Sequence, residues 1–417
     1  MRVRPAVRPV IVSLGLLAIL ASACSSTTKS SAKAPASTRS TSSCTATGVT
    51  SSSIKIGELG PLAGPAAPEF SPFFSGFKAW VDNANATGGV DGRKILVVGA
   101  NDGGITPTQN LTAAQELVEQ QHVYAVDEAS DIDEGSGSYL HQGGIPVMGY
   151  NISNTWGQFD NMFGYSGNNS AQPEPKTTDG KFLRMEGIKK LAIIGVSVPA
   201  SVTAAQEEAA SAKVAGVDVV LDNTSASVIN SVWTVQAQQV KTSGAQAVYT
   251  PMTVAQALPL YTAIQQTGDH LKFILLPQGY GLSVANQLGA AGNGMVFSIN
   301  FNPIGTNPSQ QYVIKALEKY EPGVPVTDME IDGFLSGSML REGLDLSGNC
   351  PSRKTLISKL RKVTNYDPHG FFTPPINLAT SFGEPYGMCY HYVQIQSGKL
   401  VDLNNNHPVC GTVIHTS

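Results

Sequence analysis

The stretch of sequence that decides the fold runs from Ile54 to Asp102. It contains three blocks in order, IKIGELGPLAGP (54–65), GGVDGRK (88–94) and ILVVGAND (95–102). The first and third blocks each begin with four residues typical of a strand, and the first ends in a turn rich in glycine and proline. Two short strands on either side of a helix-length segment predict a strand, crossover helix, strand unit of a parallel sheet.

The segment between the two strands carries a helical pattern. Phe73, Phe77 and Trp80 fall on one face at the three-and-four spacing that buries a stripe against a sheet. The Ser71-Pro72 pair predicts the start of this helix, because serine accepts backbone N–H bonds and proline at the first helical position loses none. The Gly88-Gly89 pair predicts its end, since glycine adopts the left-handed conformation at low cost.

Strands and helices keep alternating along the rest of the chain. Apolar runs of strand length, such as 191–196 and 273–276, are separated by helical patterns, such as 204–215 and 254–267. Short apolar strands alternating with helices are typical of a parallel sheet covered on both faces. The alternation comes in two series, separated by residues 165–175, which are rich in Gly, Asn, Ser and Pro. We therefore predict two sheets.

The three blocks quoted above resemble the opening of the leucine/isoleucine/valine-binding family of type I periplasmic binding proteins. The likeness covers roughly residues 54–400 in the order of the elements. It implies an α/β fold of two lobes, each a mainly parallel sheet with helices on both faces, with three hinge crossings. The implied lobes are residues 54–172 with 306–374, and residues 173–305 with 375–417.

The first 53 residues have the composition of a targeting segment followed by a tether. Residues 1–23 combine a basic head, a short apolar core and the small residues Ala21-Ser22-Ala23, which is typical of a signal peptide. Cys24 follows directly, in a context that resembles a bacterial lipobox, so we expect it to be lipidated. The alternative is ordinary cleavage, with Cys24 removed or left free. Residues 24–53 are mostly Ser, Thr, Ala and Lys, which predicts a flexible tether.

Four further cysteines, Cys44, Cys350, Cys389 and Cys410, allow three disulfide connectivities. In an exported protein an even number favours disulfides over metal binding, and the absence of a Cys-x-x-Cys pair argues against zinc. The topology of the resembled family implies the pairs Cys44–Cys350 and Cys389–Cys410.

Charge and motifs exclude several classes of function. The formal net charge is −4 and only 14% of residues are charged, so there is no basic patch of the kind that nucleic acid requires. The sequence contains no esterase, zinc-protease, P-loop or dinucleotide-binding motif. We therefore expect neither an enzyme, nor a cofactor, nor a bound metal.

The resemblance also implies candidate ligand-binding residues. In the family, hydroxyl residues in two loops of the first lobe receive the ligand carboxylate, and by register these roles fall on Ser130 and Ser153. Asp131 and Asn151 lie beside them. Without the resemblance, each serine would be interpreted as a loop or cap hydroxyl.

In the second lobe the candidates by register are Thr253, Gln278 and Tyr280, although Tyr280 is more often a hinge or rim residue. Gln278 stands where the family commonly has an acidic residue that pairs with a ligand ammonium. An amide supplies no counter-charge, so a zwitterionic amino acid is a doubtful ligand. In addition, five acidic residues crowd segment 127–134, most of which we expect to be solvated on the surface.

The sequence thus predicts a lipid-anchored, monomeric solute-binding protein on the outer face of a bacterial cytoplasmic membrane. It would capture an amino acid, an amide, a polyol or another small organic solute by closing two lobes, and deliver it to the permease and ATPase of an ABC importer. The alternative is a receptor domain of the same fold that reports a solute instead of transporting it.

Overall fold

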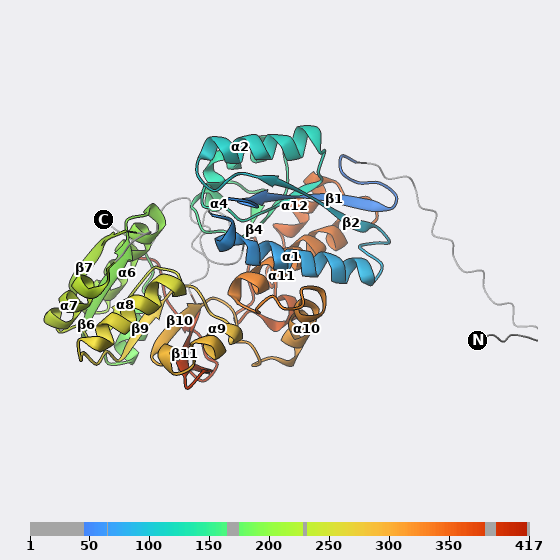
Figure 1. Ribbon diagram of the computed structural model, residues 1–417. Coiled ribbons are helices and arrows are strands. Elements are labelled where there is room, and N and C mark those ends of the chain that lie inside the picture. The colour runs from blue at the N-terminus through green and yellow to red at the C-terminus, as the bar shows by residue number, and fades with distance from the viewer. Residues whose placement is uncertain (1–45, 65, 165–174, 228–231, 380–388, 415–417) are drawn as a thin grey trace, which may run out of the picture. The chain divides into compact units, whose positions relative to one another are not determined.

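The computed structural model describes residues 46–64, 66–164, 175–227, 232–379 and 389–414 (Figure 1). The predicted signal peptide, Cys24, Cys44 and nearly all of the predicted boundary segment 165–175 lie outside these residues. Within the described part of the chain, no helix has the length and apolarity needed to cross a membrane.

The last residues of the predicted tether belong to the fold. Val49 is buried and forms short antiparallel bridges with Ala46 and Ile54. The Thr50 hydroxyl closes the turn by accepting backbone N–H bonds from the residues two and three places further on, at 3.2 and 3.0 Å. The prediction of a flexible tether is therefore wrong for residues 46–53, because a buried valine and a hydroxyl-closed turn hold them against the first strand.

The first sheet is five-stranded and parallel, in the order β2-β1-β3-β4-β5 among the described residues. Its strands are β1 (Ser53–Gly60), β2 (Lys94–Asn101), β3 (Ala125–Glu128), β4 (Val147–Gly149) and β5 (Met162–Phe163). β1 pairs with β2 in parallel, which confirms the predicted unit. Gly60 lies opposite Asn101 and Leu59 opposite Glu128, so the loops after these three strands leave the same edge of the sheet.

Helices cover both faces of the first sheet. They are α1 (Ala67–Ala86), α2 (Pro107–Gln115) continued by the π-helix η1 (Glu116–Gln120), the 3₁₀ turn η2 (Asp133–Gly135), α3 (Gly137–Gln142) and α4 (Thr155–Gln158). Phe77 and Trp80 of α1 share a core cluster with Ile54 and Ile56 of β1. On the other face, Leu59 of β1 packs with a cluster that includes residues of α2 and η1.

Helix α1 begins earlier than the sequence predicts. It starts at Ala67 with Pro68 in its first turn, and Pro72 lies inside the helix. Phe70 is buried in a cluster with Phe73 and Phe74. We infer that burying this extra aromatic turn offsets the backbone hydrogen bond that Pro72 cannot make.

The GGVDGRK block forms a tight turn whose arginine is structural. Gly89 has φ +78°, and a Cβ at this position would lie 1.9 Å from the carbonyl oxygen of Arg93. The buried Arg93 guanidinium donates through Nε to the Thr50 carbonyl and through Nη2 to the Asn349 carbonyl, both at 2.9 Å. The block thus joins the start of the fold to a segment 256 residues away.

In the part of the chain that the structure describes, the second sheet has eight strands, in the order β12-β11-β10-β9-β8-β6-β7, with β13 paired to β11. Its strands are β6 (Lys190–Val196), β7 (Asp218–Ala226), β8 (Ala247–Tyr249), β9 (Phe273–Leu276), β10 (Met295–Ile299), β11 (Cys389–Gln396), β12 (Lys399–Asp402) and β13 (Val409–Cys410). Strands β6 to β10 are parallel, and β11 to β13 add an antiparallel edge.

The second sheet also has helices on both faces: α5 (Thr178–Met185), α6 (Pro199–Val214), α7 (Thr234–Ser243), α8 (Val254–Gln266), α9 (Leu282–Leu288) and the 3₁₀ turn η3 (Gly289–Gly292). Phe182 of α5 packs with Leu191 and Phe273 on one face. Leu260 of α8 packs with Ile274 on the other. This arrangement is the mixed α/β fold with mostly parallel sheets that the sequence predicts.

After β10 the chain returns to the helices of the first sheet before it forms β11. This return comprises η4 (Pro308–Gln310), α10 (Gln311–Tyr320), α11 (Asp328–Ser347), α12 (Arg353–Leu360) and η5 (Pro368–Gly370). Helix α11 packs closely along α1 (Figure 1). A Cβ on Gly333 would lie 1.8 Å from the Phe73 carbonyl oxygen, and one on Gly76 would lie 2.0 Å from that of Glu330. Glycines therefore let the two backbones approach.

The structure contains the predicted disulfide between Cys389 and Cys410, which closes the strand pair β11–β13. Cys350 is also disulfide-bonded. Its predicted partner, Cys44, lies outside the described residues.

Candidate functional site

A buried network of polar side chains joins the loops at the carboxyl edge of the first sheet. Asp102, after β2, and Glu128, at the end of β3, are both fully buried. Asn110 of α2 donates through Nδ2 to Asp102 Oδ2 at 3.0 Å and to Glu128 Oε1 at 3.1 Å. Asn110 also accepts the N–H of Ser136 at 2.7 Å, and the Ser136 hydroxyl donates to Glu128 Oε1 at 2.9 Å. The network fixes two strand ends and the start of α3.

Ser130, a predicted ligand residue, belongs to this network. It is fully buried, and its hydroxyl donates to Asp102 Oδ2 at 2.6 Å and accepts the N–H of Ile132 at 3.3 Å. A serine hydroxyl carries a single proton. Because Asp102 takes that proton, Ser130 has none to offer a ligand carboxylate in this conformation.

Ser153, the second predicted carboxylate contact, is occupied in a similar way. Its hydroxyl donates to Asp133 Oδ1 at 2.5 Å and accepts the N–H of Thr155 at 3.1 Å, at the start of α4. Trp156 Nε1 donates to the other Asp133 oxygen at 2.6 Å. Burial raises the pKa of Asp133 to about 7, although these bonds favour its ionised form. Both predicted serines therefore hold acidic side chains of the loops in place.

The surroundings of Tyr150, which follows β4, are acidic and apolar. Burial raises the pKa of Tyr150 well above its usual value, and the charges that raise it further are four carboxylates, those of Asp332, Asp328, Asp131 and Glu69. The pKa of Glu69 is raised to about 7, first by burial and then by Asp131. The apolar part is made by Tyr150, Ile152 and Met329, which pack against the aromatic cluster of α1.

Asp131 and Asn151, the two remaining first-sheet candidates, differ in exposure. Asp131 is solvent-exposed at the loop after Ser130, and its pKa is raised by desolvation and then by Asp102 and Glu134. Asn151 is buried beside Gly164, where an added Cβ would lie 2.4 Å from the Asn151 side chain. Only Asp131 of this pair therefore presents a charged group at the surface.

The expectation that most acidic residues of this segment are solvated is wrong. Asp127, Glu128 and Asp133 are buried, and only Asp131 and Glu134 are exposed. The cause lies in residues distant in the sequence. Asp127 accepts a hydrogen bond from the hydroxyl of Ser336, which belongs to α11, 209 residues away.

The second-sheet candidates follow the carboxyl ends of β8 and β9. Thr253 is the N-cap of α8 and forms a reciprocal capping box with Gln256, in which its own N–H donates to Gln256 Oε1 at 3.3 Å. Its hydroxyl thus already serves the helix. Gln278 is half-buried in the loop after β9. Of the three second-sheet candidates, Thr253 and Tyr280 are engaged in hydrogen bonds, whereas the Gln278 amide makes none with the described residues.

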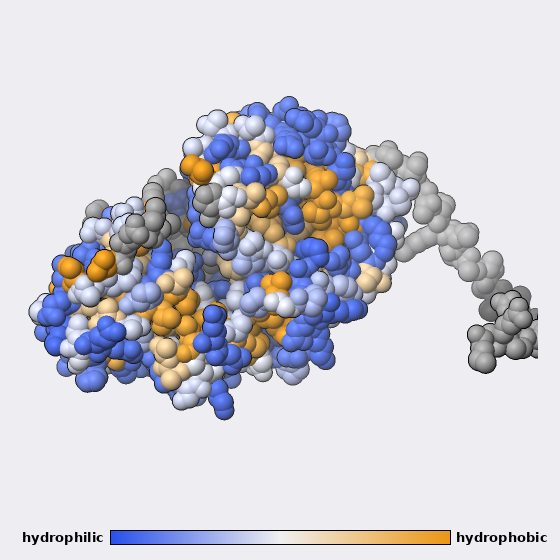
Figure 2. Space-filling model, in the orientation of Figure 1, coloured by the Kyte–Doolittle hydropathy of each residue, from blue (hydrophilic) through white to orange (hydrophobic). Residues whose placement is uncertain are grey.

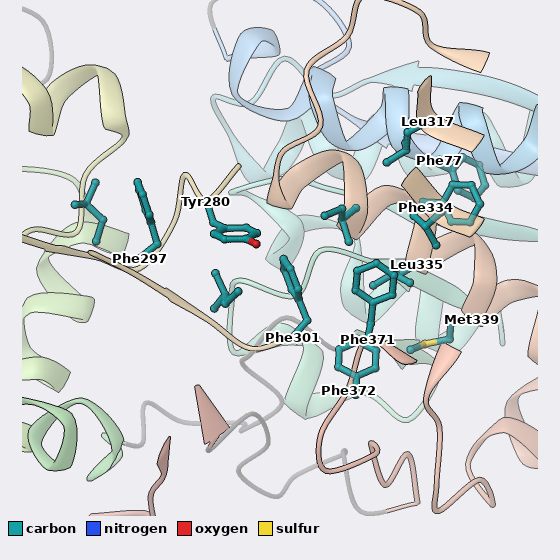
Figure 3. Packing of buried hydrophobic residues seen from close by; sticks show 14 of the residues in the cluster. Phe77, Tyr280, Phe297, Phe301, Leu317, Phe334, Leu335, Met339, Phe371 and Phe372 are labelled. Atoms are coloured by element: carbon teal, nitrogen blue, oxygen red, sulfur yellow. The ribbon is translucent and has the colours of Figure 1, made fainter. Parts of the chain in front are cut away.

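Tyr280 is buried, and its ring is packed instead of presented to solvent (Figure 3). Its ring centroid lies 5.8 Å from that of Phe301, which in turn lies 5.9 Å from that of Phe371. The Tyr280 hydroxyl accepts the N–H of Ile304 at 2.8 Å. These contacts favour the hinge interpretation of Tyr280 over that of a ligand contact.

Two hollows of the described surface lie away from these candidates. One, of about 520 Å³, runs between α1 and β2 and is lined by apolar residues such as Phe74, Val81 and Ile95, with Glu58 among its polar ones. Figure 2 shows apolar residues gathered over this part of the first sheet. The other, of about 980 Å³, borders β7 and is lined mainly by hydroxyl and amide residues. Neither hollow contains a predicted ligand residue.

Sequence reasoning missed several residues that build the site. Asp102 closes the quoted third block, but only its partners Asn110 and Ser130 show that it organises the loops. Asp328 is a second such residue, and the pattern Thr-x-x-Glu at 327–330 is the sequence signal for the helix start at which it lies. Within the described residues, no group of three or more His, Cys, Asp or Glu side chains has the arrangement of a metal site.

The chain matches one family model, described as "Periplasmic binding protein", over residues 53–399. Several solved structures share its fold. A solute-binding protein of an ABC transporter from R. palustris, in complex with benzoate, has a TM-score of 0.71 at 18% identity, covering 87% of this chain and 98% of that one. The branched-chain amino acid-binding protein LivJ of Streptococcus pneumoniae, in complex with isoleucine, has a TM-score of 0.68 at 16% identity, covering 87% and 99%.

A fatty acid ABC transporter substrate-binding protein from Thermomonospora curvata has a TM-score of 0.70 at 16% identity, covering 87% of this chain and 93% of that one. Identities this low establish the fold and leave the ligand open. Comparison with curated protein sequences finds no significant match.

Proposed function

Since the chain belongs to the periplasmic binding protein family, we propose that it is an extracytoplasmic lipoprotein that captures a small organic solute and delivers it to an ABC importer. Its structural neighbours are substrate-binding proteins of ABC transporters, with ligands as different as benzoate and isoleucine. The signal-like segment 1–23 and Cys24 support export and lipid anchoring.

We further propose that the two sheets are the two lobes of the binding protein. The chain passes from the first sheet to the second, returns in α10 to α12, and passes again to β11. This order supports the lobe limits 54–172 with 306–374 and 173–305 with 375–417. In such a protein the solute binds at the carboxyl edges of both sheets, and it favours closure only by binding the closed form more tightly.

Our proposal for the ligand rests on the charge at the carboxyl edge of the first sheet. Asp131 is an exposed carboxylate near Tyr150, and Glu69, with a pKa raised to about 7, adds negative charge as it ionises. The hydroxyls of Ser130 and Ser153 already donate hydrogen bonds to buried aspartates. A ligand carboxylate placed there would meet like charge and few donors. In the second sheet, Gln278 offers an uncharged amide. We therefore propose a solute whose head group is uncharged or cationic and donates hydrogen bonds, such as an amide or an amine.

A thermal-shift and calorimetry panel tests this proposal, because a ligand that binds the native form raises its melting temperature. The panel contrasts benzamide with benzoate, isoleucine amide with isoleucine, and includes polyols. We expect the amides to bind and the matched carboxylates to bind at least about tenfold more weakly.

Two variants refine the panel. Asp131→Asn should narrow the difference between amide and carboxylate, whereas Glu134→Gln, an exposed change in the same loop, should leave it unchanged. Tight binding of benzoate or isoleucine, with no binding of the amides, would overturn the proposed ligand class. A lack of any solute-dependent stabilisation across the panel would count against solute capture itself.

A further inference from the structure

Helix α11 begins with an aspartate, Asp328, beside a capping box that two other residues form. Thr327 and Glu330 form a reciprocal capping box, in which Glu330 Oε2 accepts the N–H of Thr327 at 3.0 Å and a hydrogen bond from its hydroxyl. These bonds satisfy the backbone N–H groups of Thr327 and Glu330. The carboxylate of Asp328, the first helical residue, is therefore available for another partner.

That partner is the loop after β9 of the second sheet. Asp328 Oδ2 accepts the backbone N–H of Gly279 at 2.8 Å and that of Tyr280 at 3.2 Å. The other oxygen, Oδ1, accepts the N–H of Met329 at 3.0 Å. The Asp328 carboxylate thus binds two consecutive backbone amides of this loop, and these amides directly follow Gln278.

The backbone beside this carboxylate reinforces the junction. The N–H of Asp328 donates to the Tyr280 carbonyl at 2.8 Å, and Gly281 forms an antiparallel bridge with Thr327. A Cβ on Gly281 would lie 3.1 Å from the Thr327 backbone, so the two segments are in close contact. The amides of Gly279 and Tyr280, however, are held by the side chain of Asp328.

The electrostatics of Asp328 make this junction sensitive to pH. Burial raises its pKa to about 6, against the three backbone N–H groups that favour the carboxylate, and the neighbouring Glu330 raises it further. Tyr150 and Tyr280 also interact with Asp328, and their own pKa values are raised first by burial and further by this carboxylate. The cost of burying the charged form thus outweighs these hydrogen bonds, and protonation near pH 6 relieves that cost.

We propose that Asp328 is a positioning residue: it joins helix α11, packed on the first sheet, to loop 277–280 of the second, and so fixes where Gln278 is presented. The importance of Gln278 rests on the proposed solute-binding function. The junction itself is tested without solute, so its failure and the failure of solute capture can be told apart.

The test is amide hydrogen exchange of the full chain, resolved at Gly279 and Tyr280 by NMR. In Asp328→Asn the side chain has one acceptor oxygen and no charge, so in either orientation it turns its N–H₂ group toward Met329 or toward the loop amides. We therefore expect the protection factors of Gly279 and Tyr280 to fall at least about tenfold. Asp328→Glu keeps the charge and should retain part of the protection. The matched control, Glu330→Gln, alters the cap of the same helix and should leave these two amides protected.

A pH series on the unaltered protein provides a second readout. Because burial raises the pKa of Asp328, an opening that exposes this carboxyl to water becomes less favourable as pH decreases. The protection factors of Gly279 and Tyr280 should therefore rise as pH decreases from 7 to 5, whereas in Asp328→Asn they should be low and independent of pH. If Asp328→Asn does not fold, the pH series alone decides. Unchanged protection in Asp328→Asn, or protection independent of pH in the unaltered protein, would overturn the proposal.

Discussion

At the scale of residues, the notable feature is a set of Asp and Glu side chains buried inside the fold. Glu208 of α6 is 2% exposed, and its carboxyl group lies beside that of Asp179. Burial, and then the nearby charge of Asp179, raise the pKa of Glu208 well above its usual value. Asp179 itself accepts the hydroxyl of Tyr392 at 2.5 Å. Glu208 therefore enters the fold most favourably in its neutral form.

Replacing Glu208 by glutamine should stabilise the protein at high pH. The substitution keeps the shape of a neutral glutamic acid and removes the cost of ionising it inside the fold. At pH 8 we expect an increase in the free energy of unfolding of about 1–3 kcal/mol, which should shrink toward zero at pH 4.5. Urea denaturation at the two pH values measures this difference.

The exposed Glu134→Gln is the control for Glu208→Gln, and it should change the free energy of unfolding by less than about 0.5 kcal/mol at either pH. A stabilisation by Glu208→Gln of equal size at both pH values would show that ionisation is not its cause.

The sequence indicated the acidic character of the site but not its burial. Asp127 and Glu128 are consecutive residues of β3, and a strand covered on both faces buries both. Their partners, Ser336 and Asn110, lie in other elements. Short-range patterns carry no information on such distant pairs, and for that reason a surface position was the natural expectation.

At the scale of elements, the close approach of α1 and α11 depends on glycine. Gly333 faces the backbone of Phe73, where an added Cβ would lie 1.8 Å from the carbonyl oxygen. Backbone atoms cannot rotate away as a side chain can. Gly333→Ala therefore requires the helices to separate, and we expect it to lower the free energy of unfolding by at least about 1–3 kcal/mol. Chemical denaturation followed by circular dichroism measures the loss.

Gly143→Ala serves as the comparison for Gly333→Ala. Gly143 ends α3, and its added Cβ would meet mainly the Ile145 side chain, at 3.2 Å. We expect it to cost less than Gly333→Ala. An equal or smaller loss for Gly333→Ala would contradict close backbone packing between α1 and α11.

The elements themselves were largely predictable because their signals are local. The strand predicted at 273–276 is β9, and the helix predicted at 254–267 is α8 (Val254–Gln266). Helix starts are harder to predict: α1 begins before Ser71 because Phe70 finds a buried position, and α11 begins at Asp328 because Thr327 and Glu330 cap it. Packing and reciprocal capping decided these bounds, and single-residue preferences did not.

At the scale of the whole molecule, the pKa values of the carboxyl groups are shifted in one direction. Among the described residues, every Asp or Glu with a resolved shift has a raised pKa, with burial as the first cause. Those of Glu58, Glu69 and Asp133 are raised to about 7. The folded chain therefore binds more protons than the unfolded chain at mildly acidic pH.

This excess of bound protons predicts that the protein is most stable on the acidic side of neutrality. A raised carboxyl pKa contributes stability that is fully present below the unfolded value, near pH 4, and that is lost as pH rises through the folded value. Between pH 5 and pH 7.5 we expect the melting temperature to fall by several degrees, since each unit of pKa shift corresponds to about 1.4 kcal/mol. Calorimetric melting at constant ionic strength measures the trend. In a Glu58→Gln, Glu69→Gln, Asp133→Asn triple variant the slope should decrease, and a melting temperature that rises steadily from pH 5 to pH 7.5 in the unaltered protein would contradict the linkage.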